Sequence, residues 1–157
     1  MRVQLVKEFL FEAAHRREDG GEGPARLHGH SYRVGLAIRG EVGAESGWVM
    51  DYGEIKARFA PLYARLDHHC LNDVEGLTDA SFVGIARWIE DRMRPVLPEL
   101  EAVYVGVVGP CRFRPAALDA DPVHGLPPRV RFGFEAAHRL VNLPPEHKCR
   151  RLHGHSF

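Results

Sequence analysis

The sequence predicts an α+β fold, an antiparallel sheet with two helices packed on one face, followed by the opening β-hairpin of a second copy. Two observations lead to this prediction. Residues 3–108 give the element order strand, strand, helix, helix, strand, which favours helices gathered on one face of a sheet. The motif FEAAHR…RLHGHS then occurs twice, at Phe11–Tyr32 and again at Phe134–Phe157. The two copies are in register, apart from a loop two residues longer in the second.

The strands of the first copy are predicted from alternation and from the residues between them. Val3–Ala14 has little glycine or proline and is typical of a strand, and a charged, glycine-rich loop follows it. Ser31–Gly40 alternates polar and apolar residues, and its apolar face consists of Tyr32, Val34, Leu36 and Ile38. Two strands joined by one loop predict an antiparallel pair. The stretch AVYVGVV, residues 102–108, predicts a further strand.

Two amphipathic helices are predicted between these strands. The first follows Asp51, a suitable N-cap with Glu54 three residues later, as in a capping box. Pro61 lies inside its pattern, which either weakens the helix prediction or predicts a kink. The second spans Phe82–Val96, and residues 67–73 between the helices, DHHCLND, are predicted to form a polar turn.

Length and composition limit the domain organisation and the class of protein. The 157 residues leave room for one domain at 1–110, a proline-rich linker at 111–128 and only an incomplete second copy at 129–157. Lysine plus arginine and aspartate plus glutamate both number 21, so we expect no nucleic-acid partner. Three cysteines are unsuited to a disulfide framework, and no membrane span or signal peptide is evident. We therefore expect a cytoplasmic protein without a membrane partner.

Three histidines in each copy have the spacing of a metal site. His28 and His30 flank Gly29, so in a strand both side chains lie on one face, and His15 ends the paired strand. The same set recurs as His138, His153 and His155. Three neutral imidazoles with an open coordination position are typical of catalytic zinc. Ten histidines would produce an occasional His-x-His by chance, but the repeated FEAAH context favours the metal interpretation.

Three further residues are candidates for proton transfer. Cys149, four residues before His153, is a candidate base or nucleophile, and it could equally be an ordinary free cysteine or a fourth zinc ligand. Asp67 and His68 are a candidate relay in which a carboxylate orients an imidazole. Local sequence alone is also compatible with a simple helix cap at these two residues.

Together these motifs resemble a known family. FEAAHR, Cys-x-x-x-His-Gly-His, Gly-x-x-x-Asp-Tyr and Leu-Asp-His-x-x-Leu-Asn are similar to the 6-pyruvoyl-tetrahydropterin synthase superfamily, especially to the bacterial 6-carboxytetrahydropterin synthases of queuosine biosynthesis. The resemblance implies a T-fold and a homo-oligomer with active sites between subunits. It implies a lyase that binds Zn²⁺ through the two histidine sets and releases triphosphate from dihydroneopterin triphosphate. Cys149 would be the base, with Asp67 and His68 as the relay pair.

The first copy departs from the family pattern at two functional positions. Pro24 stands where the family has its cysteine, and Val107 or Val108 stands where the family places a glutamate that anchors the pterin. The second copy has the thiol but stops at Phe157, so we expect a fragment of a longer tandem protein. The alternative is a whole chain whose second copy completes a site with the first. An alternative function is an inactive zinc-binding pseudo-domain with an oligomerisation or pterin-binding role.

Overall fold

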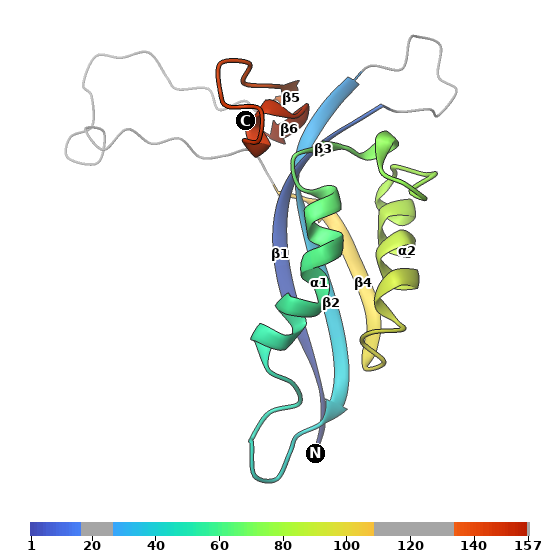
Figure 1. Ribbon diagram of the computed structural model, residues 1–157. Helices are drawn as coiled ribbons and strands as arrows, with labels where there is room; N and C mark the ends of the chain where they lie inside the picture. Colours follow the sequence, from blue (N-terminus) through green and yellow to red (C-terminus); the bar gives the residue numbers. More distant parts are fainter. Residues whose placement is uncertain (17–26, 109–133, 157) are drawn as a thin grey trace, which may run out of the picture.

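A computed structural model describes residues 1–16, 27–108 and 134–156. Its main sheet has four strands in the order β3-β1-β2-β4, and a two-stranded sheet is formed by β5 and β6 (Figure 1). The long strands β1 (Arg2–Arg16) and β2 (Leu27–Glu41) pair antiparallel along their whole length. On the other side of β2, β4 (Leu100–Val107) also pairs antiparallel. The predicted α+β class and its predominantly antiparallel sheet are confirmed.

Two helices cover one face of this sheet. Helix α1 (Tyr52–Leu66) and helix α2 (Phe82–Met93) lie on the same side of the strands in Figure 1. They enclose a core made by the apolar faces of strands and helices, which includes Phe11, Tyr32, Val34, Leu36, Ile38, Ile55, Phe59, Ile85, Ile89, Met93 and Leu97. Burial of each such side chain contributes about 1.5–3 kcal/mol, so the core fixes the position of the long strands that carry the site.

The helix boundaries follow their capping residues. The Asp51 carboxylate accepts hydrogen bonds from the backbone N–H groups of Gly53 and Glu54, as predicted for an N-cap. Helix α1 continues through Pro61 to Leu66. Helix α2 begins after Ser81, whose hydroxyl accepts from the Gly84 N–H, and it ends earlier than predicted.

The segment predicted as a polar turn is more ordered than its sequence indicates. His69 and Cys70 form a short strand, β3 (His69–Cys70), that pairs parallel with Ala13 and Ala14 of β1. A 3₁₀ turn, Leu71–Asp73, follows, and Leu71 is fully buried. Pairing with β1 brings this segment to the end of the sheet that carries the histidines.

The second copy contributes a hairpin that repeats the first in miniature. Strands β5 (Glu135–His138) and β6 (His153–Ser156) pair antiparallel, with Glu135 opposite Ser156. The corresponding pair in the first copy is Glu12 opposite Ser31, so both copies use the same register. We call the described residues 134–156 the second-copy hairpin; it packs against the ends of β1 and β2 (Figure 1). The predicted linker at 111–128 lies outside the described residues.

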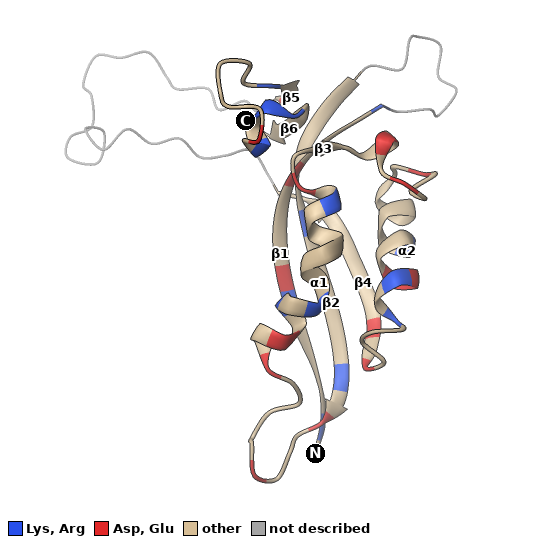
Figure 2. Cartoon of the chain, viewed as in Figure 1, with Lys and Arg blue, Asp and Glu red and all other residues tan. Residues whose placement is uncertain are grey.

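Charged residues of both signs are interspersed along the strands and helices (Figure 2). No helix in the described ranges has the length and apolar character needed to cross a membrane.

Candidate active site and metal centres

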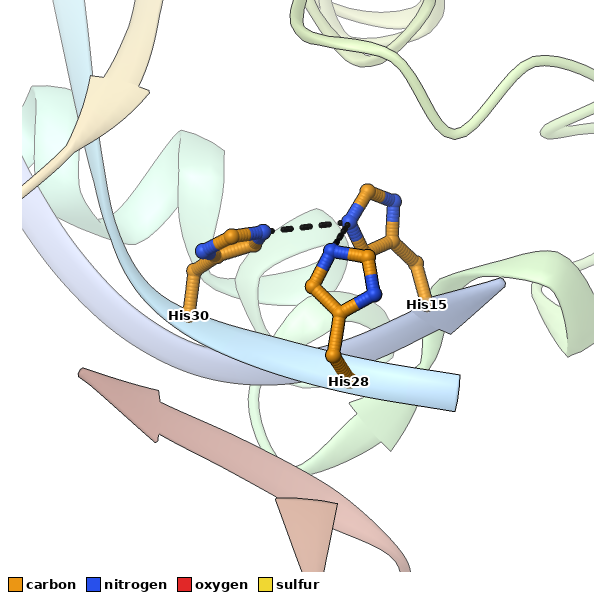
Figure 3. A group of neighbouring side chains, drawn as sticks. All are labelled: His15, His28 and His30. Carbon is orange, nitrogen blue, oxygen red and sulfur yellow. Dashed lines mark hydrogen bonds between the residues drawn. The ribbon is translucent and has the colours of Figure 1, made fainter. Parts of the chain in front are cut away.

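The first histidine triad is built by the register of β1 and β2. His15 of β1 lies directly opposite His28 of β2, and His30 follows His28 two residues later in β2. Their Nε2 atoms converge, with His15 Nε2 3.0 Å from that of His28 and 3.1 Å from that of His30 (Figure 3). Ligands of a tetrahedral zinc, about 2.0–2.1 Å from the metal, lie about 3.3–3.4 Å apart. The three nitrogens therefore need only small shifts to bind one ion.

A backbone contact supports the tautomer that metal binding needs. Nδ1 of His15 lies 3.1 Å from the carbonyl oxygen of Ala80, which can only accept a hydrogen bond. The proton of a neutral His15 ring is thus placed on Nδ1, which leaves the Nε2 lone pair for a metal. A cavity of about 600 Å³ opens beside the triad, and its lining includes Asp79, Ser81 and Phe82.

The second triad has the same construction in the second-copy hairpin. His138, His153 and His155 place their ligand atoms within 4.8 Å of one another, and the Nε2 atoms of His138 and His153 are 3.2 Å apart. His153 is almost completely buried, and its Nδ1 donates to the carbonyl of Arg151 at 2.8 Å. Burial lowers the pKa of His153 to about 4, although this hydrogen bond acts in the opposite direction. A neutral imidazole at neutral pH is the form that binds a metal.

Both triads therefore fit a divalent metal ion. Three neutral imidazoles suit zinc, copper, iron or nickel, and a set of three leaves a coordination position for substrate. Each triad is therefore a candidate metal-binding group.

Asp67 and His68 form a buried pair directly after α1. Nδ1 of His68 is 2.8 Å from Oδ1 of Asp67, which also accepts from the backbone N–H of Glu12. Lys148 of the second copy places Nζ 3.2 Å from Oδ2 of Asp67. Burial alone would raise the pKa of Asp67, but these hydrogen bonds together hold it below its ordinary value. Burial lowers the pKa of His68, while Asp67 opposes that shift.

The backbone at His68 has an uncommon conformation. Its φ of 59° lies in the left-handed region, which costs a residue other than glycine roughly 1–3 kcal/mol. The backbone N–H donates to Glu12, and the carbonyl accepts from the Arg151 side chain. Contacts from β1 and from the second-copy hairpin therefore hold His68 in place, directly after Asp67, the C-cap residue of α1.

The second-copy hairpin brings Cys149 to this pair. Ligand atoms of His68, Cys149 and His153 all lie within 4.8 Å of one another, and the His68 and His153 rings are 4.2 Å apart. On either side of this cysteine, Lys148 contacts the Asp67 carboxylate and Arg151 donates to the carbonyl oxygen of His68. Asp67 and His68 from the first copy thus meet Cys149 and the second triad. We call this group the composite site.

This arrangement has a counterpart among known families. The family model described as 6-pyruvoyl tetrahydropterin synthase matches residues 4–108 and 129–157, which include both triads, Asp67, His68 and Cys149. The chain belongs to this family. The superfamily suggested by the motifs is thereby confirmed.

Relatives with a stated activity are enzymes named for pterin chemistry. A 6-carboxy-5,6,7,8-tetrahydropterin synthase from Synechocystis sp. is 38% identical over 107 residues, which cover 64% of this chain and 83% of that protein. A dihydroneopterin monophosphate aldolase from Pyrococcus furiosus is 31% identical over 100 residues, covering 62% and 81% respectively. Both similarities place this chain among pterin synthase and lyase enzymes.

Solved structures show the fold independently of close sequence similarity. The Caenorhabditis elegans 6-pyruvoyl tetrahydropterin synthase has a TM-score of 0.58 at 20% identity, over 69% of this chain and 97% of that chain. The Plasmodium falciparum 6-pyruvoyl tetrahydropterin synthase has a TM-score of 0.51 at 18% identity, over 68% of this chain and 99% of that chain. The predicted T-fold is confirmed.

The synthase fold brings together all nine residues selected from the sequence, in two groups. His15, His28 and His30 form the first triad, and the other six belong to the composite site. Pro24 lies outside the described residues. Sequence reasoning missed Arg151, the contact of Lys148 with Asp67, and the two glutamates, Glu12 and Glu135. The repeat of FEAAH was the one signal that could have indicated the glutamates.

Proposed function

We propose that this chain is a zinc-dependent lyase of the 6-carboxytetrahydropterin synthase type, which acts on dihydroneopterin triphosphate and releases triphosphate. The observation that carries the proposal is the meeting of Cys149 with His68 and the second triad at the composite site. The relatives named 6-carboxy-5,6,7,8-tetrahydropterin synthase and dihydroneopterin monophosphate aldolase support the reaction class. We expect catalysis at the second triad, where a thiol is available.

The residues of the composite site divide into metal ligands, proton-transfer groups and a positioning group. A zinc ion held by His138, His153 and His155 would supply a Lewis acid that makes the substrate side chain more acidic. The sulfur of Cys149 accepts a proton from the side-chain carbon next to the one that bears the triphosphate. The electron pair left behind forms a carbon–carbon double bond as the carbon–oxygen bond breaks, and triphosphate leaves with the bonding electrons. His68 then takes the proton from Cys149, which restores Cys149 for the next turnover.

Two neighbouring side chains, Asp67 and Lys148, control the orientation of the His68 ring and the charge beside it. Asp67 contacts Nδ1 of His68, which directs Nε2 of the ring towards the rest of the site. Lys148 lies against the second oxygen of Asp67 and compensates its charge. The carboxylate is therefore a positioning group in this mechanism.

The experiment is triphosphate release from dihydroneopterin triphosphate by Cys149→Ala. We expect turnover to fall by about 10²–10⁴, the usual contribution of a general base, with zinc content unchanged. Cys70→Ala is the matched control, because Cys70 is a buried thiol in β3 outside the proposed machinery. Parental turnover in Cys149→Ala would refute the assignment of the base.

A second candidate function is a zinc-binding pseudo-domain without turnover. It is favoured by the first triad, which has a cavity beside it but has Pro24 in the sequence position of the family's cysteine. Under this proposal the purified chain binds zinc and a pterin but releases no triphosphate. The same assay separates the two functions.

The domain division and the oligomer are part of the proposal. We propose a first domain at 1–110 and the start of a second copy at 129–157, in a homo-oligomer. Exposed apolar side chains on the strands support association, since Leu10 and Tyr104 are more than half exposed. Light scattering after size-exclusion chromatography tests it, and a monomer at all concentrations would refute it.

A further inference from the structure

The second-copy hairpin and the first copy meet by exchanging equivalent contacts. The Ser31 N–H donates to the Ser156 hydroxyl at 3.1 Å, and the Ser156 N–H lies 3.3 Å from the Ser31 hydroxyl. Gly29 and Gly154 touch so closely that a Cβ on either would fall 2.2 or 2.1 Å from the other's Cα. Equivalent residues contacting each other reciprocally define a self-complementary interface with approximate two-fold symmetry.

The same exchange places a carboxylate of each copy against a metal-binding histidine of the other. Oε2 of Glu135 is 3.0 Å from Nδ1 of His30, and Oε2 of Glu12 is 2.9 Å from Nδ1 of His155. Nδ1 of His30 is buried and has no other polar partner among the described residues, so Glu135 is the group placed to receive its proton.

Each carboxylate is also held by its own copy. The Ser31 hydroxyl donates to Oε2 of Glu12 at 2.8 Å, and the Ser156 hydroxyl donates to Oε2 of Glu135 at 2.7 Å. The carboxylate oxygen is thus fixed between a serine of its own hairpin and a histidine of the other. The side chains involved are partly buried, with Glu12 and His155 about one quarter exposed.

We propose that Glu12 and Glu135 are positioning residues that act across the duplication, each orienting a metal ligand of the opposite copy. A carboxylate at Nδ1 favours the proton on that nitrogen, fixes the ring and makes Nε2 a stronger donor to a metal. Glu135 therefore supports the first triad, and Glu12 supports the second. This role rests on the proposed function, because it requires that the triads bind metal.

The experiment isolates one triad at a time and measures Zn²⁺ affinity by competition with a chromogenic chelator. His153→Ala leaves the first triad, because His153 belongs to both of the other candidate groups, and His28→Ala removes the first triad. In the His153→Ala background, we expect Glu135→Ala to weaken zinc binding by about 10–100-fold. Glu12→Ala is the matched control, because Glu12 belongs to the same copy as the remaining triad. We expect it to change the zinc affinity by less than about threefold. In the His28→Ala background the two glutamates exchange these effects.

A role in docking alone predicts a different pattern. If the glutamates only hold the hairpins together, both substitutions weaken zinc binding equally in each background, and this result overturns the proposal. Glu135→Gln keeps a carbonyl oxygen near His30, so we expect an affinity between those of the parent and Glu135→Ala. Thermal unfolding of every variant identifies any that fail to fold. Where a Glu→Ala variant fails to fold, the Glu→Gln variant at the same position takes its place in the comparison.

The outcome also separates this role from the proposed function. Failure of the unaltered chain to bind zinc would refute the metal centres and the positioning role together. Zinc binding with unchanged affinity in all glutamate variants would refute the positioning role and leave the proposed lyase intact.

Discussion

Substitution of Gly154 by alanine tests whether docking of the second-copy hairpin builds the composite site. The added Cβ would lie 2.1 Å from Cα of Gly29 and 2.8 Å from the carbonyl oxygen of Ala13. Carbon atoms in contact are normally about 3.5–4.0 Å apart, so the backbones must separate by about 1.4 Å or more. No side chain can move aside, because both nearest contacts are backbone atoms.

A displacement of this size has a predictable effect on catalysis. The hairpin carries Cys149 and His153, whereas His68 stays with the first copy, so the separation opens the composite site. A misplacement of about 1 Å in a catalytic group costs roughly 10²-fold in rate. Overpacking also destabilises by about 1–3 kcal/mol. We therefore expect Gly154→Ala to lose about two orders of magnitude in triphosphate release, with a lower melting temperature.

Gly106→Ala is the matched control. Gly106 lies in β4, where an added Cβ meets no heavy atom within 4 Å. We expect unchanged turnover and a stability within about 1 kcal/mol of the parent. If Gly154→Ala retains parental turnover and melting temperature, the hairpin does not dock as described and the reasoning is refuted.

Three further predictions concern the core, the relay pair and the metal. Phe59→Ala removes a fully buried ring that packs 4.8 Å from Phe9, and urea denaturation should show a loss of about 3–5 kcal/mol. The lowered pKa of Asp67 means that its contribution to stability is complete above about pH 4 and is lost as the pH falls through its folded-state value. Asp67→Asn should therefore show a weaker decrease of unfolding free energy below pH 4; an unchanged acid profile would contradict this. Zinc at about 100 times its Kd should stabilise the chain by about 2.7 kcal/mol per site in calorimetry, and excess chelator should reverse the shift; a zinc-independent melting temperature would count against both triads.

Most of the fold could be predicted because its signals are local. The alternation of Tyr32, Val34, Leu36 and Ile38 identified the buried face of β2, and Asp51 identified the start of α1. The strand β3 could not be predicted, because His69 and Cys70 become a strand only by pairing with β1, far away in the sequence. A polar composition indicated a turn there, and tertiary pairing overrode it.

The site divides in a similar way. Each triad was predictable, since His-x-His on a strand and an upstream histidine on its partner are fixed by strand geometry. The meeting of Cys149 with Asp67 and His68 followed only from the family resemblance, because no local pattern encodes contacts between the copies. The glutamates were missed for that reason: Glu12 and Glu135 were visible as repeated residues, but their crossed contacts depend on docking.

The reciprocal contact between the copies has a consequence for how this protein can change in evolution. In a homodimer with a two-fold interface, every mutation appears on both sides at once, so both partners must tolerate it. Here the two sides of the contact are encoded separately in one polypeptide, and a mutation alters only one of them. One side can therefore carry a side chain that the other lacks, and Pro24 and Cys149 occupy equivalent positions of the repeat. Gene duplication with fusion thus permits specialisation that a symmetric dimer forbids.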